Sequence, residues 1–274
     1  MNPVLKLIDL NFCYSDKQKK EEIKSFGINN ISLNIDNGDF VSVIGKNGSG
    51  KSTLVKLISG ILNGYSGNIY FRGNDIHSIE RKEFSRNVSY LPQSAAAFNE
   101  DLKVEEFLLL GRYAHKHFTD FRFSEDDKRI VSESMKETSV SDLSGKYIHK
   151  LSGGERQKVL ITLALVQLDI TGDLEGKLLI IDEPMTYLDV NYQFEIFSIL
   201  KNLREKNLTV MIVIHDLNLA LRFTGKTILM NNGEMIKFSE TKDVITEEIL
   251  KEHFLIDSKI LNFEKNYFIN YLPN

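Results

Sequence analysis

The sequence predicts an α/β protein built around a parallel sheet, with an all-helical segment inserted between its strands. Short, continuously apolar runs such as FVSVIG, KLLIID and LTVMIVIH are typical of strands that are buried on both faces. Stretches with helical spacing, among them GKSTLVKLISGIL and ERQKVLITLALVQL, alternate with these runs. Because parallel strands need crossover connections, this alternation indicates a parallel sheet with helices packed on it.

The bulk composition narrows the class of protein. The chain has 274 residues and is 42% hydrophobic, which allows one large domain or a core with a subdomain. Its formal net charge of −4 lacks the basic excess usual for nucleic-acid-binding domains, so we expect no nucleic-acid partner. The single cysteine, Cys13, excludes an internal disulfide and fits a reducing compartment. Neither a membrane span nor a signal peptide is evident, so we expect a cytoplasmic protein.

The elements follow one another in a readable order. VLKLIDLNFCY predicts a strand, and the mixed-charge run SDKQKKEEIK after it predicts a solvated hairpin loop. INNISLNID, the turn NGD and FVSVIG predict two more strands, and SGNIYFRG and NVSYLP predict another two. The tail after Thr224 predicts short strands and one small helix. We expect three divisions: residues 1–98 (β subdomain and first part of the core), 99–150 (helical), and 151–274 (second part of the core and tail).

The helical division has two clear patterns. LKVEEFLLLGRYAHKHF, residues 102–118, and SEDDKRIVSESMKET, residues 124–138, both have helical spacing. Ser124 can cap the second helix, with Asp127 at the position that completes a capping box.

Residues 45–52, GKNGSGKS, match G-x-x-x-x-G-K-[ST] in full, after a predicted strand and at the start of a predicted helix. Backbone N–H groups in this loop are expected to form a concave nest for phosphates, to which the helix dipole adds positive potential. Lys51 would place its charge on the β- and γ-phosphate oxygens, and Ser52 can offer its hydroxyl to Mg²⁺. A glycine-rich turn without a ligand is the alternative. The expected nucleotide-binding residues here are Gly45, Asn47, Gly48, Ser49, Gly50, Lys51, Ser52 and Thr53.

An acid pair follows a second buried strand, in KLLIIDEP at residues 177–184. The strand delivers Asp182 to the carboxyl end of the sheet, where a fold of this kind binds its ligand. Asp182 would hold Mg²⁺, and Glu183 is the natural group to polarise an attacking water. On its own, the motif is equally compatible with a solvated acidic turn.

Three single residues are weaker candidates. Gln93, at the end of SYLPQ, can ligate Mg²⁺ or water and sense a γ-phosphate, although a glutamine at a strand end commonly has no role. His215, at the end of VMIVIH, can donate a hydrogen bond to charge developing on that phosphate, or it can be a core histidine. Tyr14 can stack on adenine. His115 and His117, in H-K-H, resemble a metal pair, but we interpret them as a solvated helix end.

LSGGERQ, residues 151–157, predicts a second anion contact. Ser152 can cap a helix and Glu155 completes a capping box. Gly153 and Gly154 lie inside the first turn, where each costs roughly 1 kcal/mol of helix stability relative to alanine. Glycines at a helix N-terminus make sense if the backbone must come close to an anion.

Taken together, these motifs resemble the nucleotide-binding subunits of ATP-binding-cassette (ABC) transporters. The phosphate loop, Gln93, LSGGERQ, IIDEP, YLD at 187–189 and His215 occur in that family's order, over residues 4–250. The resemblance implies a P-loop NTPase (RecA-like) core with an antiparallel β subdomain and an inserted α-helical subdomain. It implies ATP and Mg²⁺ as cofactors, and it adds Asp189 to the nucleotide-binding residues.

The resemblance also implies partners. Two copies are expected to pack head to tail, so that Ser152, Gly153, Gly154 and Glu155 of one chain face the γ-phosphate on the phosphate loop of the other. ATP would then hold the dimer closed, and hydrolysis would reopen it. Two integral-membrane permease subunits and, indirectly, a substrate-binding protein are expected, with this chain on the cytoplasmic face of the membrane. The cytoplasmic helices of the permease are expected to dock in the groove between the Gln93 loop and the helical insertion, where residues 102–112 are expected to present an apolar docking surface.

Finer features suggest the cargo. VEEFLLLGRYAH and HDLNLALRF look like ATPases of importers for iron chelates, haem and cobalamin, and LDITGDLEGK and DEPMTYLDV are similar to the cobalamin and haem members. An iron complex, siderophore or haem, is the first choice and cobalamin the alternative. Lys46 departs from the proline usual in the phosphate loop, and Tyr187 departs from a small residue.

Two other classes are weighed against the transporter. A soluble ABC ATPase that acts on ribosomes or DNA usually has two cassettes or a long coiled coil, and this chain has one cassette and no basic excess. A nucleotide-binding module without turnover is disfavoured because Glu183, Gln93 and His215 are all present.

Overall fold

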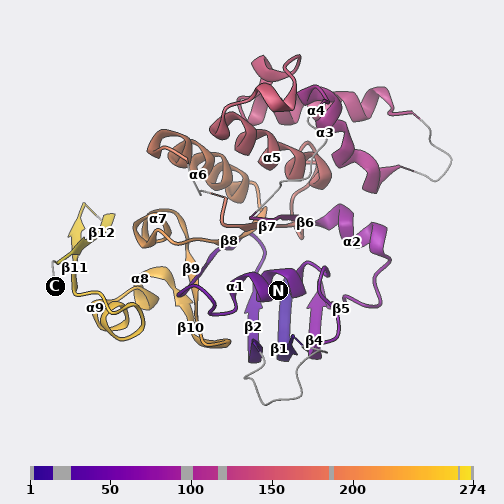
Figure 1. Cartoon of the computed structure of the whole chain (residues 1–274). Helices are drawn as coiled ribbons and strands as arrows, with labels where there is room; N and C mark the ends of the chain where they lie inside the picture. The colour runs from indigo at the N-terminus through magenta and orange to yellow at the C-terminus, as the bar shows by residue number, and fades with distance from the viewer. Residues whose placement is uncertain are drawn as a thin grey trace. The chain divides into compact units, whose positions relative to one another are not determined.

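The structure is a computed structural model, and it describes residues 3–14, 26–93, 101–116, 122–184, 188–264 and 266–272 (Figure 1). The chain divides into two compact units. The first unit combines residues 1–76 with residues 211–274, and the second consists of residues 77–210. No helix within the described ranges is long and apolar enough to cross a membrane.

Seven strands of the first unit lie side by side. In their order across the sheet they are β5 (Asn74–Asp75), β4 (Ser66–Phe71), β1 (Leu5–Cys13), β2 (Gly27–Ile35), β10 (Glu234–Glu240), β9 (Lys226–Asn231) and β3 (Phe40–Ile44). The pairings β5–β4, β4–β1 and β1–β2 are antiparallel, as the β subdomain requires. Alternate residues of β1 face the core, since Leu5 and Leu7 are buried while Lys6 between them is exposed.

The buried strand β3 carries the phosphate loop. All five of its residues are buried, and it runs parallel to β9, with Val43 opposite Ile228. A strand covered on both faces has no need of alternation, which is why its sequence is continuously apolar. The helix α1 (Lys51–Ile58) follows the loop. The strand β8 (Thr209–Val213) begins in the second unit and ends in the first, where the N–H of Ile214 donates to the Val43 carbonyl at 3.2 Å.

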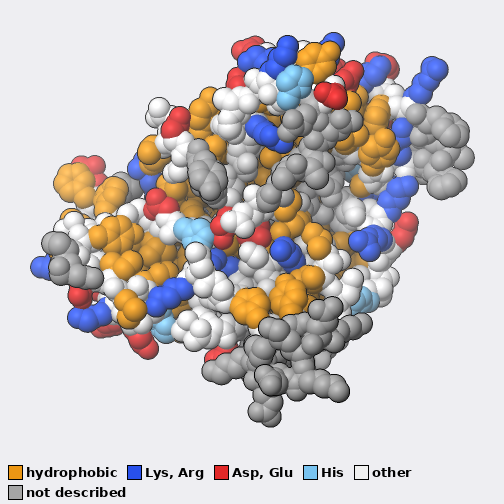
Figure 2. All heavy atoms as spheres, in the orientation of Figure 1, with side chains coloured by type: hydrophobic (Ala, Val, Ile, Leu, Met, Phe, Trp, Pro, Cys, Tyr) orange, Lys and Arg blue, Asp and Glu red, His pale blue; other side chains and the backbone are white. Residues whose placement is uncertain are grey.

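The end of the chain is more elaborate than the sequence predicts. After α7 (Leu217–Phe223) and the β9–β10 pair come α8 (Thr241–Val244), α9 (Glu247–Ile249), the π-helical η4 (Leu250–Phe254) and a hairpin of β11 (Ser258–Phe263) and β12 (Asn266–Tyr271). The prediction of one small helix is therefore wrong, because segments this short show no helical period. The hairpin is tied to α7 by the N–H of Ile269, which donates to Asn218 Oδ1 at 2.7 Å. Its outer face is apolar and exposed (Figure 2, left).

The second unit contains two parallel strands. Residues 88–91 of β6 (Val88–Leu91) pair with residues 178–181 of β7 (Leu178–Asp182), and β7 is completely buried. The helix α2 (Arg81–Asn87) precedes β6 and is absent from the sequence-based prediction, because its seven residues include only one apolar side chain, Phe84.

The remaining elements of the second unit are helical. They are α3 (Val104–Leu109), the 3₁₀ helices η1 (Leu110–His115), η2 (Ser141–Leu143) and η3 (Ile148–Lys150), and the α-helices α4 (Glu125–Glu137), α5 (Gly153–Leu168) and α6 (Val190–Glu205). The predicted capping box of α4 is confirmed, since Ser124 Oγ accepts from Asp127 N at 3.1 Å and Asp127 Oδ2 accepts from Ser124 N at 2.9 Å. The predicted single helix over residues 102–118 instead changes to a 3₁₀ helix at Leu110.

The apolar face of α3 belongs to the core of the second unit. Val104, Phe107 and Leu108 are each at most 1% exposed. The prediction that residues 102–112 present an apolar docking surface is therefore wrong for these side chains. Apolar residues at helical spacing mark a buried face, and the sequence does not distinguish burial within the chain from burial under a partner.

A buried arginine joins the start of α4 to the end of α5. Arg112 is 4% exposed, and its Nε lies 2.9 Å from Asp127 Oδ1 and its Nη1 3.3 Å from Asp169 Oδ2. Nη1 also donates to the carbonyl of Val166 at 3.3 Å. Burial raises the pKa of Asp127, but hydrogen bonds from Arg112 and Ser124 outweigh it, so that the net shift is downward. Gly111 lets η1 approach, because a Cβ there would lie 2.9 Å from the carbonyl oxygen of Leu163.

Two more side chains reach the carbonyl end of α5. His115 Nε2 lies 2.7 Å from the Gln167 carbonyl oxygen, and Lys177 Nζ donates to the carbonyls of Leu168 at 2.6 Å and Asp169 at 3.0 Å. Donors at this position satisfy carbonyls that a helix end leaves unpaired.

The interpretation of H-K-H as a solvated helix end is wrong for its first two residues. His115 is half-buried, and Lys116 is 8% exposed with Nζ 4.2 Å from the ring centroid of Phe123. His117 lies outside the described residues. Among the described residues, no group of three or more His, Cys, Asp or Glu side chains is suited to hold a metal ion.

Replacement of Arg112 by methionine is expected to lower the free energy of unfolding by about 3–5 kcal/mol, because it leaves the buried carboxylate of Asp127 without its cation. Chemical denaturation measures the change. Lys206→Met is the matched control, since Lys206 pairs with Glu137 at 2.6 Å with a side chain that is 52% exposed, and should change stability by less than about 1 kcal/mol. Equal losses in the two variants would contradict this account.

The pH dependence of stability should carry a contribution from His115. Burial is the main cause that lowers its pKa below the ordinary value, and the charge of Arg112 adds to it. Because the unfolded chain then binds the proton more readily, stability from His115 is complete above the unfolded pKa of about 6.5 and is lost as the pH falls through the folded value. Unfolding titrations from pH 7.5 downward should show a shallower acid loss for His115→Gln than for the wild type. Parallel curves would disprove the assignment.

Candidate functional site

The phosphate loop is shaped by glycines in backbone conformations that other residues rarely adopt. The φ angles of Gly45, Gly48 and Gly50 are +149°, +78° and +103°. A Cβ on Gly45 would lie 2.2 Å from the carbonyl oxygen of Met230, whereas one on Gly48 would meet nothing within 4 Å. Position 45 therefore accepts only glycine, because a side chain would collide with Met230, whereas Gly48 faces open space.

Two buried polar side chains point to a phosphate ligand. Lys51 is 4% exposed, and its Nζ donates to the carbonyls of Gly45 at 2.9 Å and Lys46 at 3.0 Å. Ser49 is 3% exposed, and its Oγ has no hydrogen-bond partner among the described residues. A cation held inside a loop of positive-φ residues at a helix start fits the predicted polyphosphate site.

Tyr14 lies beside the start of α1. Its hydroxyl is 3.4 Å from Thr53 Oγ1, and its ring stacks on Phe26 with centroids 6.0 Å apart. Phe12 meets the same ring edge-on at 4.8 Å. Since Tyr14 is 40% exposed, the structure brings it to the nucleotide-loop region with part of its surface still accessible.

His215 follows β8 and is exposed, so the alternative of a core histidine is wrong. The next residue, Asp216, caps α7, and its Oδ1 accepts from the N–H groups of Asn218 at 2.8 Å and Leu219 at 3.1 Å. The cap orients the turn that carries His215, and α7 is held in turn by the C-terminal hairpin through Asn218.

The second unit brings Gln93 and the acid pair together. Gln93 Nε2 donates to Glu183 Oε2 at 2.5 Å, and Glu183 has a φ of 51°, in the left-handed region. Asp182 is 1% exposed at the end of β7, and its Oδ2 accepts from the hydroxyl of Tyr90 at 3.1 Å. Tyr90 is absent from the sequence-based prediction. Its signal is its place in β6 opposite Ile180 of β7, two residues before Asp182.

The capping box of LSGGERQ is confirmed. Ser152 Oγ accepts from Glu155 N at 3.3 Å, and Glu155 Oε2 accepts from Ser152 N at 2.8 Å. Lys146 Nζ lies 3.0 Å from Glu155 Oε1. The hydrogen bond from the Ser152 backbone, with that from Lys146, lowers the pKa of Glu155. One oxygen of the carboxylate thus closes the N-terminus of α5 and the other contacts Lys146, while Ser152 and Gly153 remain exposed at the tip of the helix.

Asp189 caps α6, because its Oδ1 accepts from Tyr192 N at 3.0 Å. The sequence-based prediction places Asp189 among the nucleotide-binding residues and does not include its role as a helix cap. Tyr187, the departure from the family pattern two residues earlier, lies outside the described residues.

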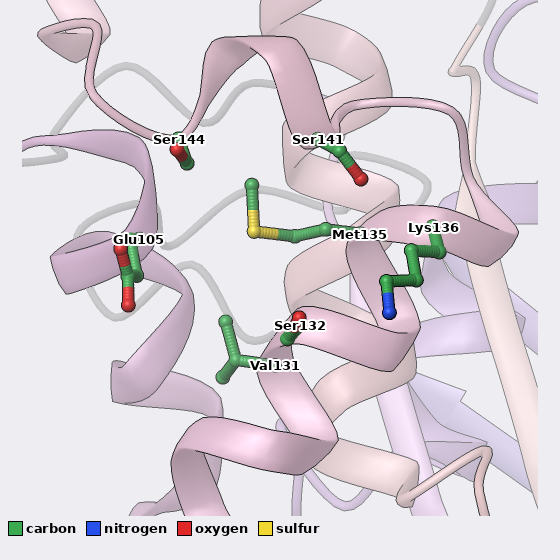
Figure 3. A pocket seen from close by; sticks show the side chains of 7 residues that line it. All are labelled: Glu105, Val131, Ser132, Met135, Lys136, Ser141 and Ser144. Carbon is green, nitrogen blue, oxygen red and sulfur yellow. The ribbon is translucent and has the colours of Figure 1, made fainter.

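A small pocket of about 200 Å³ lies elsewhere on the second unit, between α3, α4 and the segment around η2 (Figure 3). Val131 and Met135 supply its apolar surface, with Glu105 and Lys136 on different sides. None of the sequence-predicted nucleotide residues lines this pocket.

A glycine-rich loop between a buried strand and a helix, together with an acid pair at the end of another buried strand, defines a nucleotide hydrolase of the P-loop class. Comparisons with known proteins support this class. The family model described as ABC transporter matches residues 28–186. The chain therefore belongs to the ABC transporter family, as one of its ATP-binding subunits.

Two relatives illustrate the similarity. The iron(3+)-hydroxamate import ATP-binding protein FhuC of Bacillus subtilis (strain 168) is 36% identical over 85% of this chain and 84% of its own length. The ferric enterobactin transport ATP-binding protein FepC of Escherichia coli (strain K12) is 32% identical over 85% of this chain and 83% of its own length.

Two solved structures share the fold. A metal-chelate type ABC transporter in an inward-facing conformation matches with a TM-score of 0.80 and 25% identity, over 100% of this chain and 98% of that one. The ATP-binding cassette MJ0796, a dimer in a post-hydrolysis state bound to ADP and Pi, matches with a TM-score of 0.71 and 26% identity, over 86% of this chain and 98% of that one. The predicted P-loop NTPase fold is confirmed.

The loop lysine should dominate ATP affinity. Lys51→Met is expected to weaken ATP binding by at least about 10-fold, because a charge-assisted contact to phosphate is lost. Isothermal titration calorimetry measures the affinity. Lys46→Met removes the same charge from an exposed position of the same loop and should stay within about 3-fold of the wild type. If both variants lose affinity equally, Lys51 has no special place in the site.

Proposed function

We propose that this chain is the ATP-hydrolysing subunit of an importer that takes up an iron chelate through a membrane permease. ATP hydrolysis is supported by the hydrogen bond between the Gln93 amide and the Glu183 carboxylate. Glu183 directly follows the buried Asp182. The iron chelate is supported by relatives whose names specify iron(3+)-hydroxamate, ferric enterobactin and petrobactin. These relatives favour a siderophore over cobalamin, the runner-up cargo.

Each residue has a distinct task in this proposal. Lys51 and the loop N–H groups bind the phosphates, and Tyr14 stacks on adenine. Glu183 accepts a proton from the attacking water while Gln93 orients its carboxylate, and His215 donates a hydrogen bond to the γ-phosphate. Mg²⁺, when bound, neutralises charge on the phosphate oxygens, and the proposal assigns Ser52, Gln93 and Asp182 to it. The buried carboxylate of Asp182 is the oxygen ligand that this cation prefers.

The active form in this proposal is a head-to-tail dimer. Ser152, Gly153 and Gly154, with Glu155 and Asp189, face the nucleotide of the second copy, as the exposed tip of α5 allows. Each helix-end contact is worth about 0.3–2 kcal/mol. Two such sites, with Lys51 and Mg²⁺, can approach the roughly 5.5 kcal/mol that moves a two-state equilibrium from open to closed.

The partners follow from the family. Two integral-membrane permease subunits would bind the chain at the cytoplasmic face of the membrane, and a substrate-binding protein would act through them. A nucleic-acid partner is disfavoured, since basic and acidic side chains are interspersed on the face that Figure 2 shows. Because Phe107 belongs to the core, a test of permease docking should use exposed residues such as Glu105 and Tyr113.

The decisive test is Glu183→Gln. We expect the wild type to hydrolyse ATP, and the variant to lose at least about 100-fold in kcat while eluting from a sizing column as a dimer only with ATP. The amide keeps the shape of the carboxylate but accepts no proton, so binding persists without turnover. Adding Ser152→Arg should abolish the ATP-dependent dimer. Persistent hydrolysis by a monomeric Glu183→Gln variant would overturn the proposal.

A further inference from the structure

The two glycines of LSGGERQ have different surroundings. A Cβ on Gly153 would meet nothing within 4 Å. A Cβ on Gly154 would lie 2.7 Å from Cδ2 of Tyr192 and 2.8 Å from its Cε2 and Cγ. These distances are shorter than non-bonded carbon atoms tolerate, so no side chain fits at Gly154 while the Tyr192 ring stays in place.

Tyr192 lies in the first turn of α6. Its backbone N–H donates to Asp189 Oδ1 at 3.0 Å, which fixes the first turn of α6. A second contact lies beside the first. Lys158, one turn after Gly154 on α5, has its Nζ 5.4 Å from the Tyr192 ring centroid and 3.0 Å from Glu195 Oε1 on α6. Lys158 is only 8% exposed, whereas the side chain of Glu195 is 39% exposed, so the cation is shielded from water and its carboxylate partner is partly accessible.

We infer that Tyr192 is a positioning residue, whose ring seats against Gly154 and fixes the first turn of α5 relative to the first turn of α6. The consequence is a set separation between Ser152, at the tip of α5, and Asp189, at the tip of α6. The inference rests on the proposed function, because both tips act there on the nucleotide of the second copy. Tyr192 itself touches no nucleotide in this account.

An alternative role for Gly154 is to let its backbone approach the phosphate. The two roles predict opposite results when the ring is removed. If the glycine makes room for phosphate, an added methyl group harms the dimer whether or not the ring is present. If it makes room for Tyr192, the methyl group harms the dimer only while the ring is present.

A double-mutant cycle in the Glu183→Gln chain separates these roles. The measured quantity is the ATP concentration that gives half-maximal dimer on a sizing column. Gly154→Ala should raise it by about 10-fold, and Tyr192→Ala should raise it by a similar factor, because each disturbs the spacing of the two tips. In chains that already carry Tyr192→Ala, adding Gly154→Ala should change it by less than about 2-fold. Tyr192→Phe keeps the ring and should retain the parent value.

Gly153→Ala is the matched comparison, because it adds the same methyl group one residue away, out of reach of the ring. Whatever its effect, Tyr192→Ala should not relieve it. Thermal unfolding of every variant separates loss of fold from loss of dimer. If Gly154→Ala fails to fold, the test is the ATP concentration for half-maximal dimer in Tyr192→Ala compared with Tyr192→Phe. A higher value for Tyr192→Ala alone supports the positioning role of the ring.

Two results would overturn the inference: an equal effect of Gly154→Ala with and without the ring, or a Tyr192→Ala chain that dimerises at the parent ATP concentration. A parent Glu183→Gln chain that forms no dimer with ATP is a different failure, because it refutes the proposed function on which the inference rests.

Discussion

The close contact between the phosphate loop and the β9–β10 turn is the constraint on which the first unit depends. Gly45 can pass the carbonyl of Met230 only because it has no side chain, and the N–H of Gly233 donates to the carbonyl of Ser49 at 3.0 Å. The loop is thus braced by a segment from far along the chain. Together with the pairings of β3 with β9 and of β2 with β10, this contact joins the N-terminal and C-terminal parts of the sequence in one compact unit.

In the second unit the corresponding role belongs to α5, whose two ends are fixed by different means. Its N-terminus is closed by the Ser152–Glu155 capping box and Lys146, and its C-terminal carbonyls receive Arg112, His115 and Lys177. The cations Arg112 and Lys177 suit the negative end of the helix dipole, and the positive end is left with exposed glycine and serine. A helix anchored in this way can present its tip to an anion without fraying.

Much of this arrangement could be predicted from the sequence, because the signals are local. The buried strands are continuous apolar runs, and both capping boxes depend on residues three apart. The errors about burial share one physical origin, which is that burial depends on distant partners. Phe107 has the spacing of any amphipathic helix, and only its fold shows that the covering surface belongs to the same chain. Likewise, His115 meets Gln167, a residue from the far end of α5.

Gly153 and Gly154 also show that local sequence does not reveal contacts with residues far along the chain. In the sequence, Gly153 and Gly154 are indistinguishable, and a single explanation by close approach of an anion serves both. In the structure, one faces open space and the other faces an aromatic ring from the next α-helix, which begins at Val190. In a short motif, one residue can therefore be required for ligand binding while the adjacent residue is required for packing. Removing the neighbouring ring relieves only the packing requirement. The packing and ligand-binding requirements can therefore be separated by experiment, although the sequence pattern does not distinguish them.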